Sequence, residues 1–228
     1  GDLGREPVYQ ELSSCPPSGS PVQPPVRLES AHGVKENVAT LIDHLETRLG
    51  QLVGAWSVRD GAPDGAAQVG YFTGGVFEGL RSYATITLHE THLVSPTSGE
   101  PQHLELLGCG RPLAGDEDGP FPGVLEWVAE RLATTGRAVL RGEVVSLPMP
   151  LTPDGPMTAL YAAMPVYFDD DFLSVTLENG TNVSVVWLVP IHGAEAEYVA
   201  KNGWPAFEDE LRKQDPDLFD LDRPHLNL

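Results

Sequence analysis

The sequence predicts a globular protein that contains both α-helices and β-strands. Near the N-terminus, apolar residues from Val34 to Leu49 fall three or four positions apart, which places them on one face of a helix. From residue 55 to residue 107, short runs of β-branched and aromatic residues alternate with glycine-containing loops, the pattern of strands. The apolar run from Val183 to Val189 is typical of a strand that is covered on both faces.

The first thirty residues differ from the rest of the chain. Six prolines, with serine and glycine between them, leave few backbone donors and little apolar periodicity, so we expect an extended tail or linker. A proline-rich ligand for another domain is the alternative. The chain of 228 residues is long enough for one or two domains. We therefore divide it into a Pro-rich N-terminal extension, residues 1–30, and a folded part, residues 31–228.

The first half of the folded part begins with the helix that ends at Gly50. Residues 68–72 predict a short strand. Residues 83–94 and 103–107 predict two further strands, which we expect to form a hairpin across the loop that begins at Pro96. The glycine-containing segment 73–79 lacks the spacing of a phosphate-binding loop, so it is interpreted as a flexible connection.

The second half is predicted to alternate in the same way. A helix over residues 124–135 ends at Gly136, and strands follow over residues 138–147 and 158–166. Asn179-Gly180 predicts a type I′ turn between two strands, because both central residues of that turn have positive φ. Pro190 is expected to break the second of these strands. A helix over residues 194–202 then stops at Gly203, and another starts at Trp204-Pro205.

The net charge of −19 is the most unusual bulk property. It argues against nucleic acid as a partner, because phosphate binding needs clustered Lys and Arg, and it favours encounter with a basic protein. No apolar run approaches the roughly 20 residues of a membrane span. Two cysteines, Cys15 and Cys109, are interpreted as free thiols of a cytoplasmic protein. Because the chain begins with Gly1 rather than Met, a removed export signal stays an alternative.

No catalytic or metal-binding pattern is found, and we expect no cofactor and no metal. His89 and His92 would point to opposite faces of a strand, so they would not bind one metal ion. His103 and Glu105 match the first part of a zinc-deaminase signature, but its downstream cysteine pair is missing. The acidic loop 115–119 lacks the alternating oxygen ligands of a calcium loop.

The end of the chain resembles the C-terminal signature of the Suppressor of fused (SUFU) domain. The resemblance is carried by Trp187-Leu-Val-Pro-Ile191, followed by Glu195-Ala-Glu197 and by Tyr198-Val-Ala-Lys-Asn-Gly203. Similar elements lie upstream in the same order, so that the resemblance spans about residues 33–223: Leu49-Gly50, Tyr83-Ala-Thr-Ile-Thr-Leu88, Leu104-Glu-Leu-Leu107, the helix at 124–132, and the segments 147–157 and 158–161. One departure is Leu88-His89-Glu90, where the family often has Gly-Leu-Ser.

The resemblance implies a single α+β domain with a central mixed, largely antiparallel sheet flanked by helices. It also implies a non-enzymatic protein-binding role. In animals such a domain looks like one lobe of a protein that sequesters a transcription factor, and stand-alone bacterial relatives are thought to include immunity proteins that neutralise toxins. The function expected from resemblance and charge is therefore binding of another, basic protein. Acidic residues are the candidate contacts: Asp169, Asp170, Asp171, Glu195, Glu197, Asp215 and Asp217.

Three alternatives stay open at this point. The acidic residues are also typical of an ordinary solvated surface. The seven histidines would be the raw material of a hydrolase or metal-dependent enzyme. An exposed sheet edge would let the chain act as a structural subunit that pairs with another chain. Either a monomer or a homodimer is compatible with the sequence.

Overall fold

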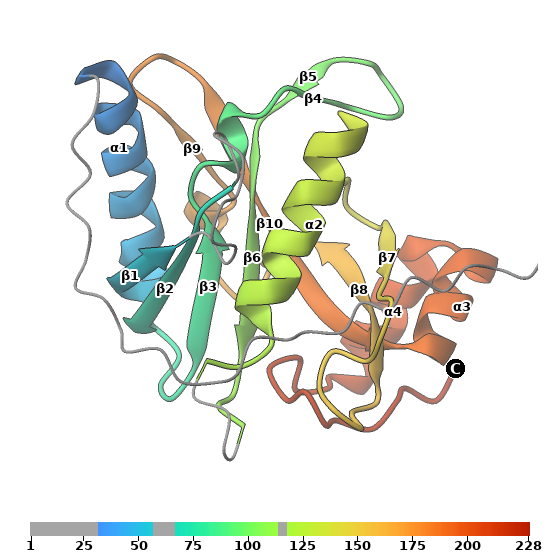
Figure 1. Ribbon diagram of the computed structural model, residues 1–228. Coiled ribbons are helices and arrows are strands. Elements are labelled where there is room, and N and C mark those ends of the chain that lie inside the picture. The colour runs from blue at the N-terminus through green and yellow to red at the C-terminus, as the bar shows by residue number, and fades with distance from the viewer. Residues whose placement is uncertain (1–31, 57–66, 114–117) are drawn as a thin grey trace, which may run out of the picture.

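The computed structural model describes residues 32–56, 67–113 and 118–228; the predicted extension over residues 1–30 lies outside them. One mixed sheet runs through the whole described part (Figure 1). Its order is β1 (Gly50–Trp56), β2 (Val69–Gly74), β3 (Arg81–Thr85), β6 (Leu104–Gly110), β10 (Asn182–His192), β8 (Met157–Ala163) and β7 (Val144–Ser146), and β9 (Ser174–Thr176) also pairs with β10. Only β6 and β10 are parallel. The mixed, largely antiparallel sheet predicted above is confirmed.

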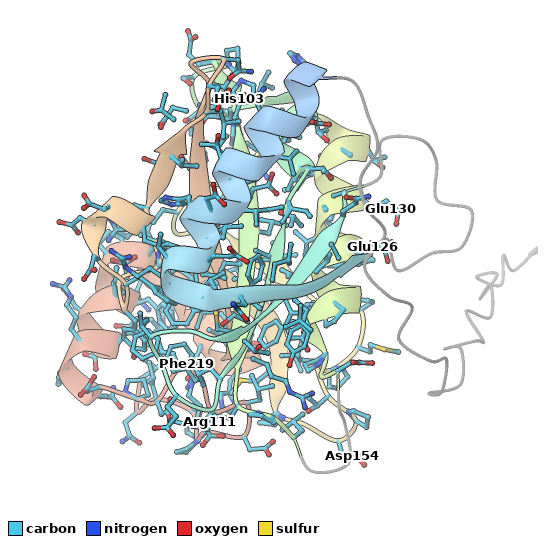
Figure 2. The ribbon with its side chains drawn as sticks, turned by 90° about the vertical axis from the view of Figure 1, so that its left-hand side faces the viewer. His103, Arg111, Glu126, Glu130, Asp154 and Phe219 are labelled. Atoms are coloured by element: carbon cyan, nitrogen blue, oxygen red, sulfur yellow. The ribbon has the colours of Figure 1, made fainter. Side chains whose placement is uncertain are left out.

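In the described part of the chain, four α-helices cover the two faces of this sheet: α1 (His32–Leu49), α2 (Phe121–Thr135), α3 (Gly193–Asn202) and α4 (Trp204–Gln214). The leucines of α1, Phe207 of α4 and Phe219 of the C-terminal tail pack on one face. Leu125 and Val128 of α2 pack on the other. Figure 2 shows α2 and the α3–α4 pair on opposite sides of the sheet. None of the helices in the described part is long and apolar enough to cross a membrane.

Strand β10 is the centre of the sheet, as its apolar sequence predicts. It pairs with β6 through residues 184–187, with β8 through residues 187–192 and with β9 at its start. Trp187 and Leu188 are fully buried on opposite faces. The expectation that Pro190 ends the strand is wrong, because β10 continues to His192. The β6 pairing has already ended at Trp187, so the missing N–H of Pro190 leaves no ladder bond unmade on that side.

The turn between β9 and β10 also differs from the expectation. Gly180 has φ +84, but Asn179 does not have a positive φ, so the two-residue type I′ turn is not formed. Instead, the Leu177 carbonyl accepts from Gly180 N (2.9 Å), and Leu177 N donates to the Thr181 carbonyl (2.8 Å). This longer loop, with one left-handed glycine, is another common hairpin connection. The hairpin itself, with Val183 opposite Val175, is confirmed.

Residues 83–94 do not form one strand. β3 ends at Thr85, and a 3-10 turn, η1 (Leu88–Glu90), follows before the short ribbon of β4 (Leu93–Val94) and β5 (Pro101–Gln102). The physical cause is Glu105, whose buried carboxylate accepts hydrogen bonds from the backbone N–H groups of Leu88 (3.2 Å) and His89 (3.0 Å). These bonds turn the chain away from the sheet. Similarly, only Val144–Ser146 of the predicted strand 138–147 is extended and paired, and β8 stops at Ala163, before Pro165.

The predicted helix ends agree well with the structure. α1 stops at Leu49, where Gly50 adopts φ +87, and α2 is closed by Gly136 with φ +63. α3 stops before Gly203, and Pro205 occupies the first turn of α4. The C-terminal tail after α4 folds back onto the sheet, with Phe219 and Leu226 buried. In Figure 2 Phe219 lies beside Arg111, whose N–H donates to the Phe219 carbonyl (3.0 Å).

Candidate functional site

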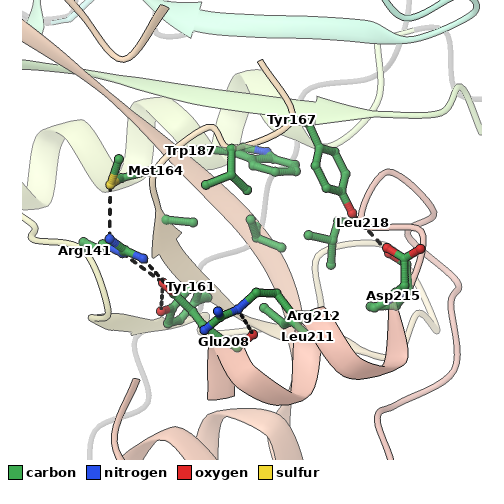
Figure 3. A pocket seen from close by; sticks show the side chains of 14 residues that line it. Arg141, Tyr161, Met164, Tyr167, Trp187, Glu208, Leu211, Arg212, Asp215 and Leu218 are labelled. Atoms are coloured by element: carbon green, nitrogen blue, oxygen red, sulfur yellow. Dashed lines mark hydrogen bonds and ion pairs between the residues drawn. The ribbon is translucent and has the colours of Figure 1, made fainter. Parts of the chain in front are cut away.

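A pocket of about 380 Å³ lies between the sheet and α4, near the end where the tail begins (Figure 3). Its size is in the range that accommodates an amino-acid side chain or a small ligand. The lining comes from four separate parts of the chain: Arg141; Tyr161, Ala163, Met164, Val166 and Tyr167 in and after β8; Trp187 and Val189 of β10; and Glu208, Leu211, Arg212, Asp215, Pro216 and Leu218 in and after α4.

Strand periodicity places the floor of the pocket. Tyr161 and Ala163 are two residues apart on β8, and Trp187 and Val189 are two residues apart on β10, so all four face the same side of the sheet. Ala163 is the smallest of them. Opposite the floor lies Leu211 of α4. The interior of the pocket is therefore mainly apolar.

One wall of the pocket is polar and internally paired. Glu208 accepts a hydrogen bond from Arg141 Nε (3.0 Å), a second from Arg141 Nη2, and a third from the Tyr161 hydroxyl (2.9 Å). Burial raises the pKa of Glu208, but these bonds outweigh it and hold that pKa below its usual value. Burial, then the Glu208 carboxylate, raises the pKa of Tyr161. Glu208 is thus ionised at neutral pH and has no proton to donate, and its charge is paired with that of Arg141.

This arrangement replaces the helix pairs expected from sequence spacing. Glu208 and Arg212 are four residues apart on α4, a spacing that favours an ion pair, but the Glu208 carboxylate is bound by Arg141 instead. The Arg212 side chain pairs with Asp209 (2.5 Å). Lys213, which is four residues after Asp209, pairs with Glu210 (3.1 Å). A buried tyrosine hydroxyl and an arginine from another segment offer Glu208 a less exposed site than the helix surface does.

The rim of the pocket carries exposed apolar and aromatic side chains. Val166 and Tyr167 of the lining are 61% and 37% exposed, and Trp204, which lies outside the lining but stacks on Arg141, is 39% exposed. The guanidinium of Arg141 lies 4.7 Å from the centre of the Trp204 ring and also contacts Met164 Sδ (3.3 Å). Exposed large apolar side chains grouped around an apolar pocket are typical of a surface that is covered by a partner.

Two of the predicted acidic groups lie near this pocket. Asp215 lines it, and Asp169, Asp170 and Asp171 follow Tyr167 along the chain. The Tyr167 hydroxyl donates to the Pro216 carbonyl (3.3 Å), which joins the two segments. Asp169 is paired with Arg48 (2.9 Å). Within the described residues, the side chains of Asp170, Asp171 and Asp215 have no cationic partner.

The other predicted acidic residues are placed differently. Asp217 is exposed and paired with Arg111 (2.6 Å), which holds its pKa below the usual value although burial opposes the shift. Glu197 is exposed on α3, outside the pocket lining. Glu195 corrects the expectation of a surface carboxylate. It is fully buried and forms a two-pronged ion pair with Arg223, at 2.8 and 2.7 Å, so it is not available on the surface.

The histidine side chains in the described part of the chain do not form a metal site. His89, interpreted above as a strand residue, lies in η1, where its Nδ1 contacts the buried Glu105 carboxylate (2.6 Å). His92 is exposed and His103 Nδ1 donates to the His89 carbonyl (2.9 Å). Among the residues that the structure describes, no group of three or more His, Cys, Asp or Glu side chains is arranged to hold a metal ion.

The sequence motif of the Suppressor of fused protein family matches residues 68–224, more than half of the chain. The chain belongs to the Suppressor of fused family. The resemblance recognised in the sequence is thereby confirmed, and all the residues that line the pocket, Trp187 and Glu208 among them, lie within the matched residues. None of the curated protein sequences matches the chain.

Solved structures of SUFU proteins have the same fold at low sequence identity. A putative SUFU homologue from Neisseria gonorrhoeae is similar with a TM-score of 0.66 and 15% identity, over 85% of this chain and 97% of that one. The Sufu–Fu complex gives a TM-score of 0.61 and 13% identity, over 84% and 92%. Drosophila Suppressor of Fused gives 0.60 and 13%, over 85% of this chain and 51% of the Drosophila chain. These similarities establish the SUFU fold as a single α+β domain.

Proposed function

We propose that this SUFU-family chain is a non-enzymatic protein-binding domain, whose pocket receives an apolar side chain of the partner. The observation that carries the proposal is the combination of an apolar pocket with exposed Val166 and Tyr167 in its lining. Binding energy at protein interfaces is concentrated in such aromatic and arginine-rich pockets. The polar wall supports binding rather than chemistry, because Glu208, Arg141 and Tyr161 are already engaged with one another.

Comparison with relatives supports the same proposal. In one similar structure a Sufu protein is in complex with another protein, Fu. This chain covers 97% of the solved chain of the gonococcal homologue, which supports a role for the domain on its own. The net charge of −19 favours a basic partner. Within this reading, the physiological role we propose is that of a cytoplasmic immunity protein that neutralises a toxin. Rescue of growth when the chain is co-expressed with the toxic product of a neighbouring gene would support this role.

The pocket is tested by filling it. Ala163→Phe places an aromatic ring in the pocket, and Ala200→Phe, at an exposed position on α3, is the matched control. Peptides are first selected from a random display library on the unmodified protein, and their affinities are then measured for both variants. Burial of one large apolar side chain stabilises by about 1.5–3 kcal/mol, so Ala163→Phe should weaken binding about tenfold or more.

Circular dichroism and thermal melting check that both variants are folded. Equal affinities of the Ala163→Phe and Ala200→Phe proteins for the selected peptides would refute the pocket as the binding site. So would a failure of the library to yield any peptide that binds the folded protein, because an accessible apolar side-chain pocket should select for apolar anchors.

A further inference from the structure

We propose that the partner segment combines its apolar anchor with an adjacent Lys or Arg, and that this cation lies at the Asp215 end of the pocket. This inference rests on the proposed function and specifies the chemistry of the partner. It starts from an asymmetry of charge around the pocket. At one end Arg141 is neutralised by Glu208. At the lip, Arg212 is paired with Asp209.

The opposite end has a carboxylate without a cation. Asp215 lines the pocket, is exposed and has no cationic partner among the described residues. It is also the residue that closes α4, in a left-handed conformation with φ +45. The carbonyl end of a helix carries partial negative charge, which adds to the attraction for a cation. At the Arg141 end of the pocket the charges are already paired, whereas at the Asp215 end the carboxylate can bind a positive charge of the partner.

Nearby carboxylates extend the negative region outward. Asp170 and Asp171 lie three and four residues after Tyr167 and are likewise exposed without a cation in the described part of the chain. Tyr167 ties this segment to Pro216, next to Asp215. Arg48 is partly buried and Arg111 is exposed, and each already has a carboxylate partner, Asp169 and Asp217 respectively. The uncompensated charge beside the pocket is therefore negative.

The apolar lining of the pocket can contact the methylene chain of a Lys or Arg as well as the apolar anchor residue next to it. Leu211 and Leu218 line the same side of the pocket as Asp215, and the exposed ring of Tyr167 lies beside Pro216 (Figure 3). Lys and Arg bury their methylene chains along such surfaces while the charged head stays in water, and an aromatic ring face attracts the cation. An apolar residue followed by a basic one is the segment that fits both features.

The test is a double-mutant cycle, in which the charge is removed from the protein, from the peptide and from both. On the protein, Asp215→Asn removes the charge and keeps a residue type that tolerates a left-handed φ. The matched control is Glu197→Gln, an exposed carboxylate on α3 outside the pocket. On the ligand, a library-selected peptide is compared with the version in which norleucine replaces its basic residue. We expect Asp215→Asn to weaken the basic peptide about three- to fivefold, as for exposed ion pairs, and to leave the norleucine peptide unchanged.

The outcomes separate this inference from the proposed function. If Ala163→Phe abolishes peptide binding but Asp215→Asn and Glu197→Gln have equal effects, the pocket binds peptides and the basic specificity is wrong. The same conclusion follows if selected peptides carry no excess of Lys or Arg. If Ala163→Phe has no effect on binding, the proposed function fails whatever the charges do. A larger loss for Asp215→Asn at 20 mM than at 500 mM salt would support the ionic contact.

Discussion

Replacement of Arg223 by Met is predicted to destabilise the protein strongly by breaking the ion pair that fixes the C-terminal tail. Arg223 is 2% exposed and Glu195 is 0% exposed. Two guanidinium nitrogens hold the two carboxylate oxygens at 2.8 and 2.7 Å, and Arg223 Nη1 also donates to the Pro224 carbonyl (3.1 Å). In the variant, Glu195 keeps only the backbone N–H groups of His192 (3.0 Å) and Leu226 (2.9 Å).

The magnitude follows from the burial of the pair. Removal of one partner from a buried ion pair typically costs about 3–5 kcal/mol, because a charge is left in the interior without compensation. Whole domains are stable by only about 5–15 kcal/mol, so this loss is a large part of the total. Arg212→Met is the matched control, since its pair with Asp209 is 73% and 71% exposed and such surface pairs contribute at most about 1 kcal/mol.

The pH dependence has a definite sign. Burial raises the pKa of Glu195, but Arg223 and the backbone donors of Leu226 and His192 outweigh it, so that pKa lies below its usual value. The stabilisation by the pair is therefore present at neutral pH and is lost as the pH falls through the folded-state pKa. In Arg223→Met, the effect of burial on the pKa of Glu195 is no longer offset by the arginine, so that pKa rises. We expect the difference in unfolding free energy between the two proteins to be largest near pH 7 and to shrink as the pH falls from the raised pKa of Glu195 in the variant to its lowered pKa in the unmodified protein.

Urea unfolding followed by circular dichroism gives the loss of unfolding free energy and its pH dependence. Limited proteolysis reports on the order of the C-terminal tail. We expect the tail after α4 to be cleaved first in Arg223→Met. Adding Glu195→Gln should recover part of the stability, because the neutral amide still accepts from Leu226. A loss below about 1 kcal/mol for Arg223→Met, equal to that of Arg212→Met, would refute the reasoning.

Three further predictions concern the core. Gly108→Ala should cost about 1–3 kcal/mol in urea unfolding, since its Cβ would lie 2.3 Å from the Phe121 ring; an unchanged stability would contradict this packing. Burial raises the pKa of the Cys109 thiol to about 12. In a Cys15→Ser protein that thiol should therefore resist a disulfide reagent at pH 8 until urea unfolds the chain, and rapid labelling of the folded protein would be the opposing result. In Glu105→Gln an NH2 group replaces one of the two carboxylate oxygens that accept three buried hydrogen bonds, so the unfolding free energy should fall by about 2–3 kcal/mol; a loss within error of zero would show that those bonds contribute nothing.

Local patterns in the sequence were sufficient for most of the fold. The apolar run of β10, the helical face of α1 and the glycines that end the helices each depend on residues that are close in sequence. Their positions therefore follow from periodicity and backbone preference. Pro190 was misinterpreted because a proline is tolerated where a strand has a neighbour on one side only, and the extent of the β6 pairing is not visible in the sequence.

The site could not be predicted in the same way. Glu195 was expected on the surface because acidic residues are common in the first turn of a helix, but its partner Arg223 lies 28 residues later. The pocket brings Arg141, Ala163, Trp187 and Leu211 together from separate elements, and no spacing along the chain marks them as neighbours. Of the predicted acidic residues, only Asp215 lines the pocket. The composition of an interface pocket is a property of the tertiary fold.

Site-specific photo-crosslinking tests the central claim most directly. A benzoylphenylalanine is placed at Val166, which is 61% exposed at the rim of the pocket, or at Val53, which is 51% exposed on the edge strand β1. Each protein is irradiated with a library-selected peptide. We predict that the peptide is crosslinked from Val166, that Ala163→Phe prevents this, and that Val53 gives no product. Crosslinking from Val53 alone would contradict the pocket and favour pairing of the partner with the sheet edge.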